Sequence, residues 1–209
     1  MIADCGVQIV DFDSNKVLMT DKIKHIISSS IETKTKILND DVFIKKIKDA
    51  VAVIVNAFEK GNKVFFCGNG GSAADAQHLA AEFSGRFYLD RKALPSEALH
   101  ANTSYLTAVA NDYSYDVIYA RLVEGICSEG DVLVGLSTSG NSANIINAFQ
   151  VARKKKVVTI GFTGATGGKL KEISDLLFNV PSTDTPRIQE SHIMIGHIIC
   201  ELVEAKLFA

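Results

Sequence analysis

Two side chains that can exchange protons or bind a metal lie four residues apart in the sequence, at His78 and Glu82. The surrounding residues 72–84 have the composition of a helix, and this spacing places both side chains on one helical face. An imidazole and a carboxylate so placed can form part of a metal site or act on a substrate as acid and base. The alternative is an ion pair on a solvated helix face, and the spacing alone does not decide between the two.

A second group of such side chains lies in the apolar C-terminal segment, at Gln189, His192 and His197. Apolar residues at helical spacing predict a helix over residues 185–207. At about 100° per residue, His192 projects on one side of Gln189 and His197 on the other. Either histidine can be a hydrogen-bonded packing residue and either can face a ligand, so the spacing does not choose between them.

A glycine-rich turn precedes the first of these helices. The run VFFCGNGGS at residues 64–72 indicates a buried strand that ends in Asn69, Gly70 and Gly71, with Ser72 at the start of the helix. Glycines let backbone N–H groups approach a ligand, and a helix N-terminus attracts anions. The turn has neither the Lys-Ser/Thr pair of a P-loop nor the G-x-G-x-x-G spacing of a dinucleotide site. A sugar phosphate therefore fits it better than a nucleotide.

A second strand-to-helix turn is rich in hydroxyl groups. The apolar run DVLVGL is followed by STSGNS, which places hydroxyls at Ser137, Thr138, Ser139 and Ser142 ahead of a predicted helix. Hydroxyl donors can satisfy phosphate oxygens. Helix capping, the alternative, needs only one such residue, so that four within six positions favour an anion site.

A further polar pair, Asn111 and Asp112, follows an apolar run that ends at residue 110. These side chains can contact the hydroxyls of a sugar. They can equally begin a turn, which is the more usual role of an Asn-Asp pair.

The elements that would position these residues alternate between strands and helices after residue 63. We predict strands at 64–67, 97–100, 132–136, 157–162 and 176–180, and helices at 72–84, 104–110, 118–126, 141–153, 168–173 and 185–207. Two amphipathic helices precede them, at 20–38 and 41–59, the first with Thr20 or Asp21 as its N-cap. This alternation is typical of an α/β protein with a mostly parallel sheet, whose ligands lie at the carboxyl ends of the strands. Both polar turns fall there.

The composition limits the classes of function and partner. The chain has 209 residues, 47% of them hydrophobic, and a net charge of −2. We therefore expect a single core and neither nucleic acid nor a membrane as a partner. The four cysteines are far apart and form no C-x-x-C pair, which favours reduced thiols and a cytoplasmic location.

The sequence resembles the sugar isomerase (SIS) domain family in four motifs: GNGGSAADAQHLAAEFSGRF, NDYSYD, GDVLVGLSTSGNSAN and RIQESHIMIGHIICELVE. The resemblance covers residues 19–209, which would form the SIS domain, and leaves residues 1–18 as an N-terminal extension. It implies a five-stranded, doubly wound parallel sheet of the flavodoxin-like kind. N-terminal and C-terminal helices would flank the sheet and assemble a homotetramer, with active sites near the subunit interfaces.

The resemblance implies an aldose–ketose isomerase that acts on sedoheptulose 7-phosphate in the first step of nucleotide-activated heptose synthesis. Glu82 and His197 would be the catalytic acid/base groups, which leaves His192 as a packing residue. One zinc ion per subunit would be bound by His78, Glu82, Gln189 and His197. The substrate would contact Asn69, Gly70, Gly71, Ser72, Glu82, Asn111, Asp112, Ser137, Thr138, Ser139, Ser142 and Gln189.

The alternative within the family is a non-catalytic regulator that binds a replication initiator protein. Such relatives typically lack the acid/base residues and the third residue of the S-T-S turn. Glu82, Ser139 and His197 are all present in this chain, which favours the isomerase.

Overall fold

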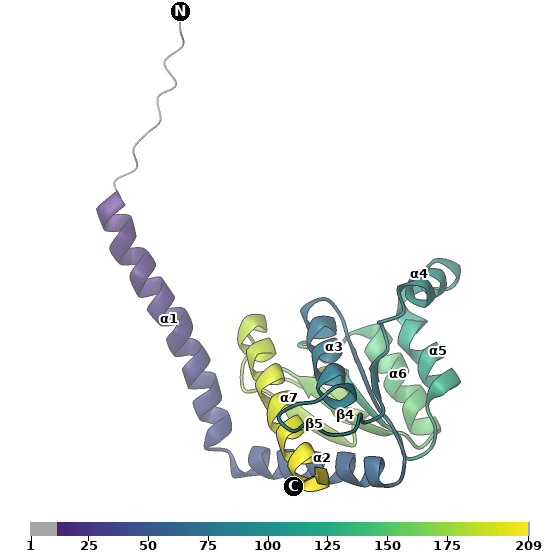
Figure 1. Cartoon of the computed structure of the whole chain (residues 1–209). Coiled ribbons are helices and arrows are strands. Elements are labelled where there is room, and N and C mark those ends of the chain that lie inside the picture. The colour runs from purple at the N-terminus through teal and green to yellow at the C-terminus, as the bar shows by residue number, and fades with distance from the viewer. Residues whose placement is uncertain (1–11, 209) are drawn as a thin grey trace, which may run out of the picture.

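The computed structural model of the chain describes residues 12–208, with side chains from residue 18 onward. A five-stranded sheet lies at its centre, and every neighbouring pair of strands is parallel (Figure 1). Its order is β2-β1-β3-β4-β5, which confirms the doubly wound, flavodoxin-like prediction. The strands are β1 (Val64–Gly68), β2 (Ser96–Ala98), β3 (Val132–Leu136), β4 (Val158–Thr163) and β5 (Leu176–Asn179).

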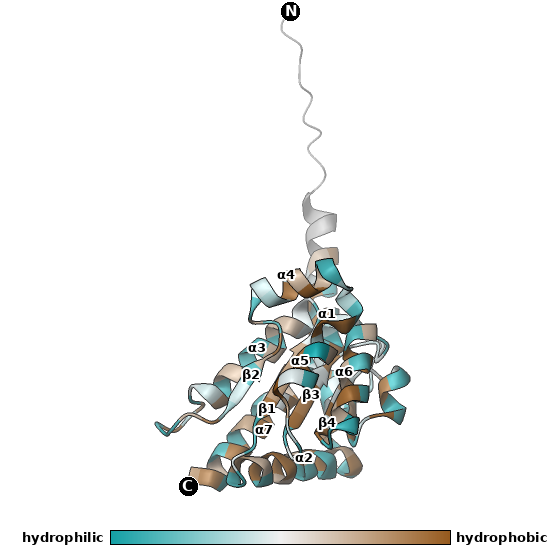
Figure 2. Cartoon of the chain, turned by 90° about the vertical axis from the view of Figure 1, so that its right-hand side faces the viewer, coloured by the Kyte–Doolittle hydropathy of each residue, from teal (hydrophilic) through white to brown (hydrophobic). Residues whose placement is uncertain are grey.

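Helices cover both faces of the sheet (Figure 1). One face packs against α2 (Asp41–Glu59), α3 (Gly71–Ser84) and α7 (Thr185–Phe208). The other face packs against α4 (Thr103–Asp112), α5 (Ile118–Ile126) and α6 (Ala143–Lys154). Apolar side chains of helices and strands meet in two cores, one on each side of the sheet. Figure 2 colours the ribbon by hydropathy and shows hydrophobic residues in the strands and in the helices that cover them.

The central strands β1 and β3 are apolar on both faces, which explains why helices cover both sides of the sheet. Every residue of both strands is buried, as expected of apolar runs in parallel sheets. The register places Gly68 opposite Leu136, so that the two strands end side by side. The chain continues from β1 into α3 on one face and from β3 into α6 on the other. The two polar turns therefore flank the point where the sheet changes its winding direction, the usual ligand site of this architecture.

Three details differ from the sequence prediction. The first helix, α1, spans Phe12–Leu38 and begins well before Thr20, so the predicted N-cap is wrong. Several earlier polar residues are equally able to begin a helix, and Thr20 lies in the helix interior. The predicted helix after β4 is a short 3-10 helix, η2 (Gly168–Glu172). A second 3-10 helix, η1 (Tyr115–Val117), precedes α5.

The N-terminal extension lies mostly outside the described residues, since the description begins at Phe12. The expected boundary between residues 18 and 19 falls inside α1. The division of the chain into residues 1–18 and 19–209 therefore stays a prediction.

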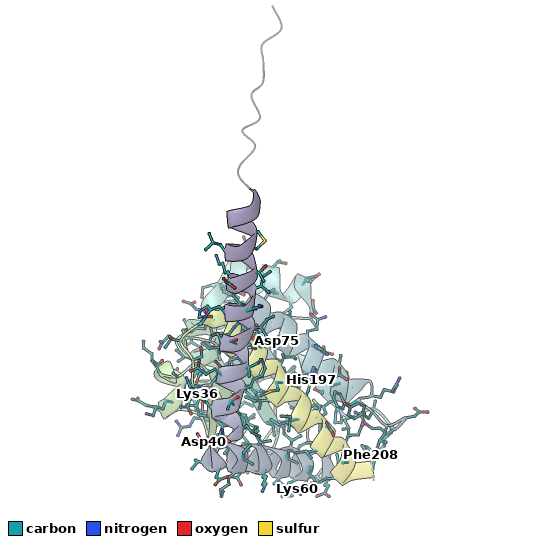
Figure 3. All side chains as sticks on the ribbon, turned by 90° about the vertical axis from the view of Figure 1, so that its left-hand side faces the viewer. Lys36, Asp40, Lys60, Asp75, His197 and Phe208 are labelled. Carbon is teal, nitrogen blue, oxygen red and sulfur yellow. The ribbon has the colours of Figure 1, made fainter. Side chains whose placement is uncertain are left out.

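Helix α1 leaves the body of the molecule and carries uncovered apolar side chains. It rises from the start of α2 and contacts α7 (Figures 1 and 3). Leu18, Met19, Ile23, Ile27 and Ile31 have exposed fractions between 52% and 67%. No helix within residues 12–208 has the length and apolar character that crossing a membrane requires.

Candidate active site

The glycine-rich turn after β1 adopts a backbone that needs glycine. Gly70 has φ 56° and ψ −121°, a combination that side chains disfavour. The N–H group of Ser72 donates to the Asn69 carbonyl at 3.1 Å, and Ser72 is buried. A Cβ atom on Gly71 would lie 2.6 Å from the Gln189 amide nitrogen. The missing side chain at this position thus allows α7 to bring Gln189 against the first turn of α3.

Asn69 is fixed by two partners that the sequence did not reveal. Its amide exchanges hydrogen bonds with the buried Asn144 amide, each at 2.9 Å. The Tyr115 hydroxyl donates to Asn69 Oδ1 at 3.0 Å. Asn144 follows the hydroxyl-rich turn and Tyr115 begins η1, so this group of side chains ties the two predicted anion turns together.

The hydroxyl-rich turn after β3 does not act as a helix cap. Ser142 stands at the N-cap position of α6, but its side chain makes no capping hydrogen bond. Its hydroxyl instead lies 2.8 Å from the Ser137 hydroxyl, while Ser139 Oγ accepts from the Asn141 N–H at 3.1 Å. The amides of the first turn of α6 therefore receive no cap from the hydroxyls of the turn, and the Ile145 N–H donates to Asn144 Oδ1 at 3.0 Å. This arrangement supports the anion-site prediction over the capping alternative.

The facing loop holds this turn in place. A Cβ atom on Gly140 would lie 2.1 Å from the Gly167 carbonyl oxygen, so the two loops touch through their backbones. A cavity of about 290 Å³ opens beside them, lined by Thr138 and Ser139. Its remaining hydroxyl-bearing lining residues were not anticipated from the sequence: Thr166, Ser182, Thr183 and Thr185. They come from the loop after β4, the loop after β5 and the start of α7, and only the fold shows that they surround one space.

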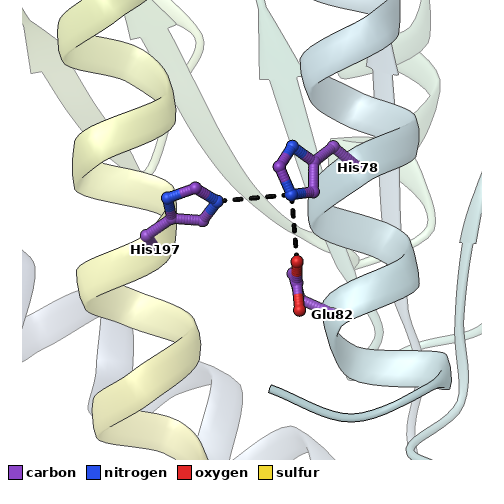
Figure 4. A group of neighbouring side chains, drawn as sticks. All are labelled: His78, Glu82 and His197. Carbon is purple, nitrogen blue, oxygen red and sulfur yellow. Dashed lines mark hydrogen bonds and ion pairs between the residues drawn. The ribbon is translucent and has the colours of Figure 1, made fainter. Parts of the chain in front are cut away.

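His78, Glu82 and His197 lie together between α3 and α7 (Figure 4). His78 Nε2 lies 2.9 Å from Glu82 Oε1, as the spacing of four residues predicted. His197 Nε2 approaches His78 Nε2 to 3.4 Å from the neighbouring helix. An ion pair on a solvated helix face therefore does not describe the group fully, because a third titratable side chain from a distant part of the chain joins the pair.

The geometry of these three side chains fits a metal ion. One ligand atom from each lies within 4.8 Å of the others. A tetrahedral zinc ion with ligands at about 2.0–2.1 Å separates neighbouring ligand atoms by about 3.3 Å. The two facing imidazole nitrogens stand at 3.4 Å, close to that separation. Two imidazoles and a carboxylate are also a donor set that suits zinc.

A close approach of two helices brings the histidines together. A Cβ atom on Gly196 would lie 2.5 Å from the Leu79 side chain, so this glycine lets α7 come nearer to α3. Asp75, one turn before His78, lies half-buried beside the same group. Burial raises the pKa of the Asp75 carboxyl, while His78 and His197 act in the opposite direction. Asp75 could have been found from the sequence, because its spacing from His78 and Glu82 places it on the same helical face.

Other predicted residues lie apart from this group. Gln189 contacts Gly71, which is seven residues before His78 and so about 10 Å away along α3. Asn111 and Asp112 are exposed at the end of α4, where the Asn111 amide donates to Asp112 Oδ1 at 2.9 Å. Within the single chain, the structure brings neither Gln189 nor this pair onto the His78 cluster. Their roles stay predictions.

His192 is a buried packing residue, as the resemblance implied. Its side chain is fully buried, its Nε2–H donates to the Thr163 carbonyl at 3.2 Å, and its ring packs edge-on against Phe162. His197, five residues later, faces α3 instead. The structure therefore separates two histidines that the helical spacing left equivalent.

Comparisons with known proteins agree with this architecture. Residues 36–164 match the family described as the SIS domain. The phosphoheptose isomerase of Clostridium acetobutylicum is 55% identical over 190 residues, which cover 91% of this chain and 97% of that protein. The phosphoheptose isomerase of Aneurinibacillus thermoaerophilus is 50% identical over 91% of this chain and 96% of its own length. The solved phosphoheptose isomerase of Neisseria gonorrhoeae superposes with a TM-score of 0.84 and 37% identity, covering 90% of this chain and 99% of its own.

Proposed function

Because the chain belongs to the SIS domain family and is about half identical to phosphoheptose isomerases over most of its length, we propose that it is an aldose–ketose isomerase of a seven-carbon sugar phosphate. Its reaction interconverts sedoheptulose 7-phosphate and D-glycero-D-manno-heptose 7-phosphate in heptose biosynthesis. The observation that carries the proposal is the group of Glu82, His78 and His197 between α3 and α7. A non-catalytic regulator would have no need of this group.

The reaction requires a proton to leave the carbon beside a carbonyl and return to the neighbouring carbon. A carboxylate above both carbons can take and return that proton, and Glu82 fills this role. His197 moves the second proton between the hydroxyl and the carbonyl oxygen. The 2.9 Å contact between His78 and Glu82 orients the carboxylate.

The two turns hold the substrate. Ser137, Thr138, Ser139 and Ser142 bind the phosphate with hydroxyl and backbone donors, which positions the sugar rather than making bonds. Asn69, Gly70, Gly71 and Ser72 contact the sugar chain beside them. Asn111, Asp112 and Gln189 complete the set of sugar contacts that the family resemblance implies. Support comes from the register of β1 and β3, which ends both strands side by side.

One zinc ion per subunit is held by His78, Glu82 and His197, with Gln189 as the fourth ligand. When bound, zinc would polarise the substrate oxygens and favour the loss of the carbon-bound proton. Support comes from the ligand separations and the donor types of the three side chains. Because Gln189 lies against Gly71, about 10 Å along α3 from His78, a second subunit would have to supply this ligand.

The protein assembles as a homotetramer with its active sites near the subunit interfaces. The exposed isoleucines of α1 support this proposal, because a row of uncovered apolar side chains on a long helix typically marks a protein interface. The partners are therefore copies of the same chain and a sugar phosphate, without nucleic acid or membrane. Cys67, Cys127 and Cys200 are free and buried, which supports a cytoplasmic location.

The proposed reaction is tested by incubating the protein with sedoheptulose 7-phosphate and following the aldose by NMR. The Glu82→Gln variant should lose turnover and the exchange of deuterium from heavy water while still binding substrate. An amide has nearly the same shape but cannot accept the proton. Wild-type protein that neither forms the aldose nor exchanges deuterium would refute the isomerase and favour the regulator.

A further inference from the structure

A buried ion pair joins the segment after α3 to the C-terminal end of α7. Arg91 Nε lies 2.9 Å from Glu204 Oε2, and the two side chains keep only 3% and 2% of their surface exposed. Neither residue belongs to the substrate or metal contacts described above. Removing two charges from water costs free energy, which the contacts of this pair must offset.

Glu204 binds the backbone of the chain that follows α3. Its carboxylate accepts N–H groups from Phe87 at 3.0 Å, Tyr88 at 2.7 Å and Leu89 at 2.7 Å, in addition to Arg91. Burial acts to raise the pKa of the Glu204 carboxyl, but these donors outweigh it and the pKa is lowered. The side chain is thus a charged anchor that fixes three consecutive residues to α7.

Arg91 binds the C-terminal end of α3. Its guanidinium donates to the carbonyl oxygens of Glu82 at 2.8 Å, Phe83 at 2.8 Å and Gly85 at 3.0 Å. Carbonyl groups in the last turn of a helix have no partner within the helix, and Arg91 supplies one. The guanidinium therefore holds the backbone of Glu82 itself.

The same anchor also supports α7 near His197. His197 and Glu204 are seven residues apart on α7, about two turns, and so lie on one helical face. The ring of Phe87, whose N–H group is bound by Glu204, packs 5.7 Å from the His197 ring at an angle of 38°. Glu204 thus contacts the backbone segment that supports His197, while Arg91 supports Glu82.

We propose that Arg91 and Glu204 are positioning residues that set the separation of Glu82 from His197. This inference rests on the proposed roles of those two side chains. A pair that only stabilised the fold would change the unfolding temperature and nothing else. A positioning pair must also change the proton-transfer step and the affinity of the His78, Glu82 and His197 group for zinc.

The test compares Glu204→Gln with Glu201→Gln, which makes the same chemical change at an exposed position of the same helix. The measurements are kcat and KM for sedoheptulose 7-phosphate, the zinc dissociation constant by chelator competition, and the visible spectrum of the cobalt-loaded protein. In Glu204→Gln we expect kcat to fall by about tenfold or more, because small displacements of reacting groups are costly. KM should stay near the wild-type value, since the hydroxyl-rich turn that binds the phosphate is distant from Glu204. Zinc binding should weaken, and the spectrum of the cobalt-loaded protein should change. Glu201→Gln should match the wild type throughout.

A milder variant covers the case in which Glu204→Gln does not fold. Phe87→Leu keeps the ion pair and removes only the ring beside His197, so it should lower kcat and zinc affinity in the same direction. Unchanged kcat and zinc affinity in folded Glu204→Gln, or in Phe87→Leu when the former fails to fold, would overturn the inference. The zinc measurement needs no turnover. A wild-type protein without isomerase activity would therefore refute the proposed reaction, and zinc affinity would still decide the role of the pair.

Discussion

The buried His192 makes the stability of the protein sensitive to mild acid. Its neutral ring donates Nε2–H to the Thr163 carbonyl, and its Nδ1 atom is buried without a hydrogen-bond partner among residues 12–208. Protonation would place a charge and a second N–H in an apolar site. Burial accordingly lowers the pKa of His192 to about 4, whereas a histidine in an unfolded chain titrates near about 6.5.

The direction of the effect follows from which state binds the proton. Between these two pKa values the unfolded chain is protonated at this residue and the folded chain is not, so the free energy of unfolding falls as the pH falls. Below the folded pKa both states are protonated and the loss is complete. With these pKa values, lowering the pH from about 7.5 to about 5 should remove about 2 kcal/mol of stability through this one residue.

The assay is urea unfolding of wild type and His192→Gln at both pH values. Protein concentration must be constant, because assembly contributes to apparent stability. Glutamine cannot titrate in this range, so the variant should lose about 2 kcal/mol less than the wild type on acidification. His25→Gln, at an exposed position on α1, should lose as much as the wild type. Equal losses in wild type and His192→Gln would refute the reasoning.

Three further outcomes are expected. Ser137→Ala and Ser139→Ala should each weaken the binding of inorganic phosphate and substrate, by roughly 1.5–3 kcal/mol for a hydrogen bond to a charged oxygen. Calorimetric titration measures both affinities, and unchanged affinity in the double variant would place the anion site elsewhere. His197→Ala should lower the zinc content found by metal analysis, and full occupancy would remove His197 from the ligands. Deleting residues 1–18 should leave the activity intact, and the oligomer should keep its size in size exclusion, because the family resemblance begins near residue 19. Dissociation would show that the first turns of α1 belong to the interface.

The sequence was sufficient for the sheet because its signals are local. The apolar runs that form β1 and β3 end at turns rich in glycine and hydroxyl side chains, which mark the ends of the strands. The alternation of strands with helices then leaves little choice of topology. The start of α1 was misplaced because capping residues are common enough to suggest several starts, and a long exposed helix offers no burial pattern to choose among them.

The site was predictable only in part because it combines local and distant contacts. The pairing of His78 with Glu82 follows from the spacing within one helix. The approach of His197 depends on Gly196 packing against Leu79, a contact between segments more than a hundred residues apart that no spacing rule contains. The choice of His197 over His192 came from the family resemblance, and the structure supplies its physical reason.

The backbone contact between the two loops at the hydroxyl-rich turn has a thermodynamic consequence. Gly140 and Gly168 each lie so close to the facing loop that a Cβ atom would meet a carbonyl oxygen, that of Gly167 for Gly140 and that of Ser139 for Gly168. The turn is therefore preorganised before an anion arrives, and binding loses little conformational entropy. An alanine at Gly140 would leave every hydroxyl in the chain yet push the loops apart. We therefore expect the affinity for phosphate to depend on residues that have no side chain with which to touch it.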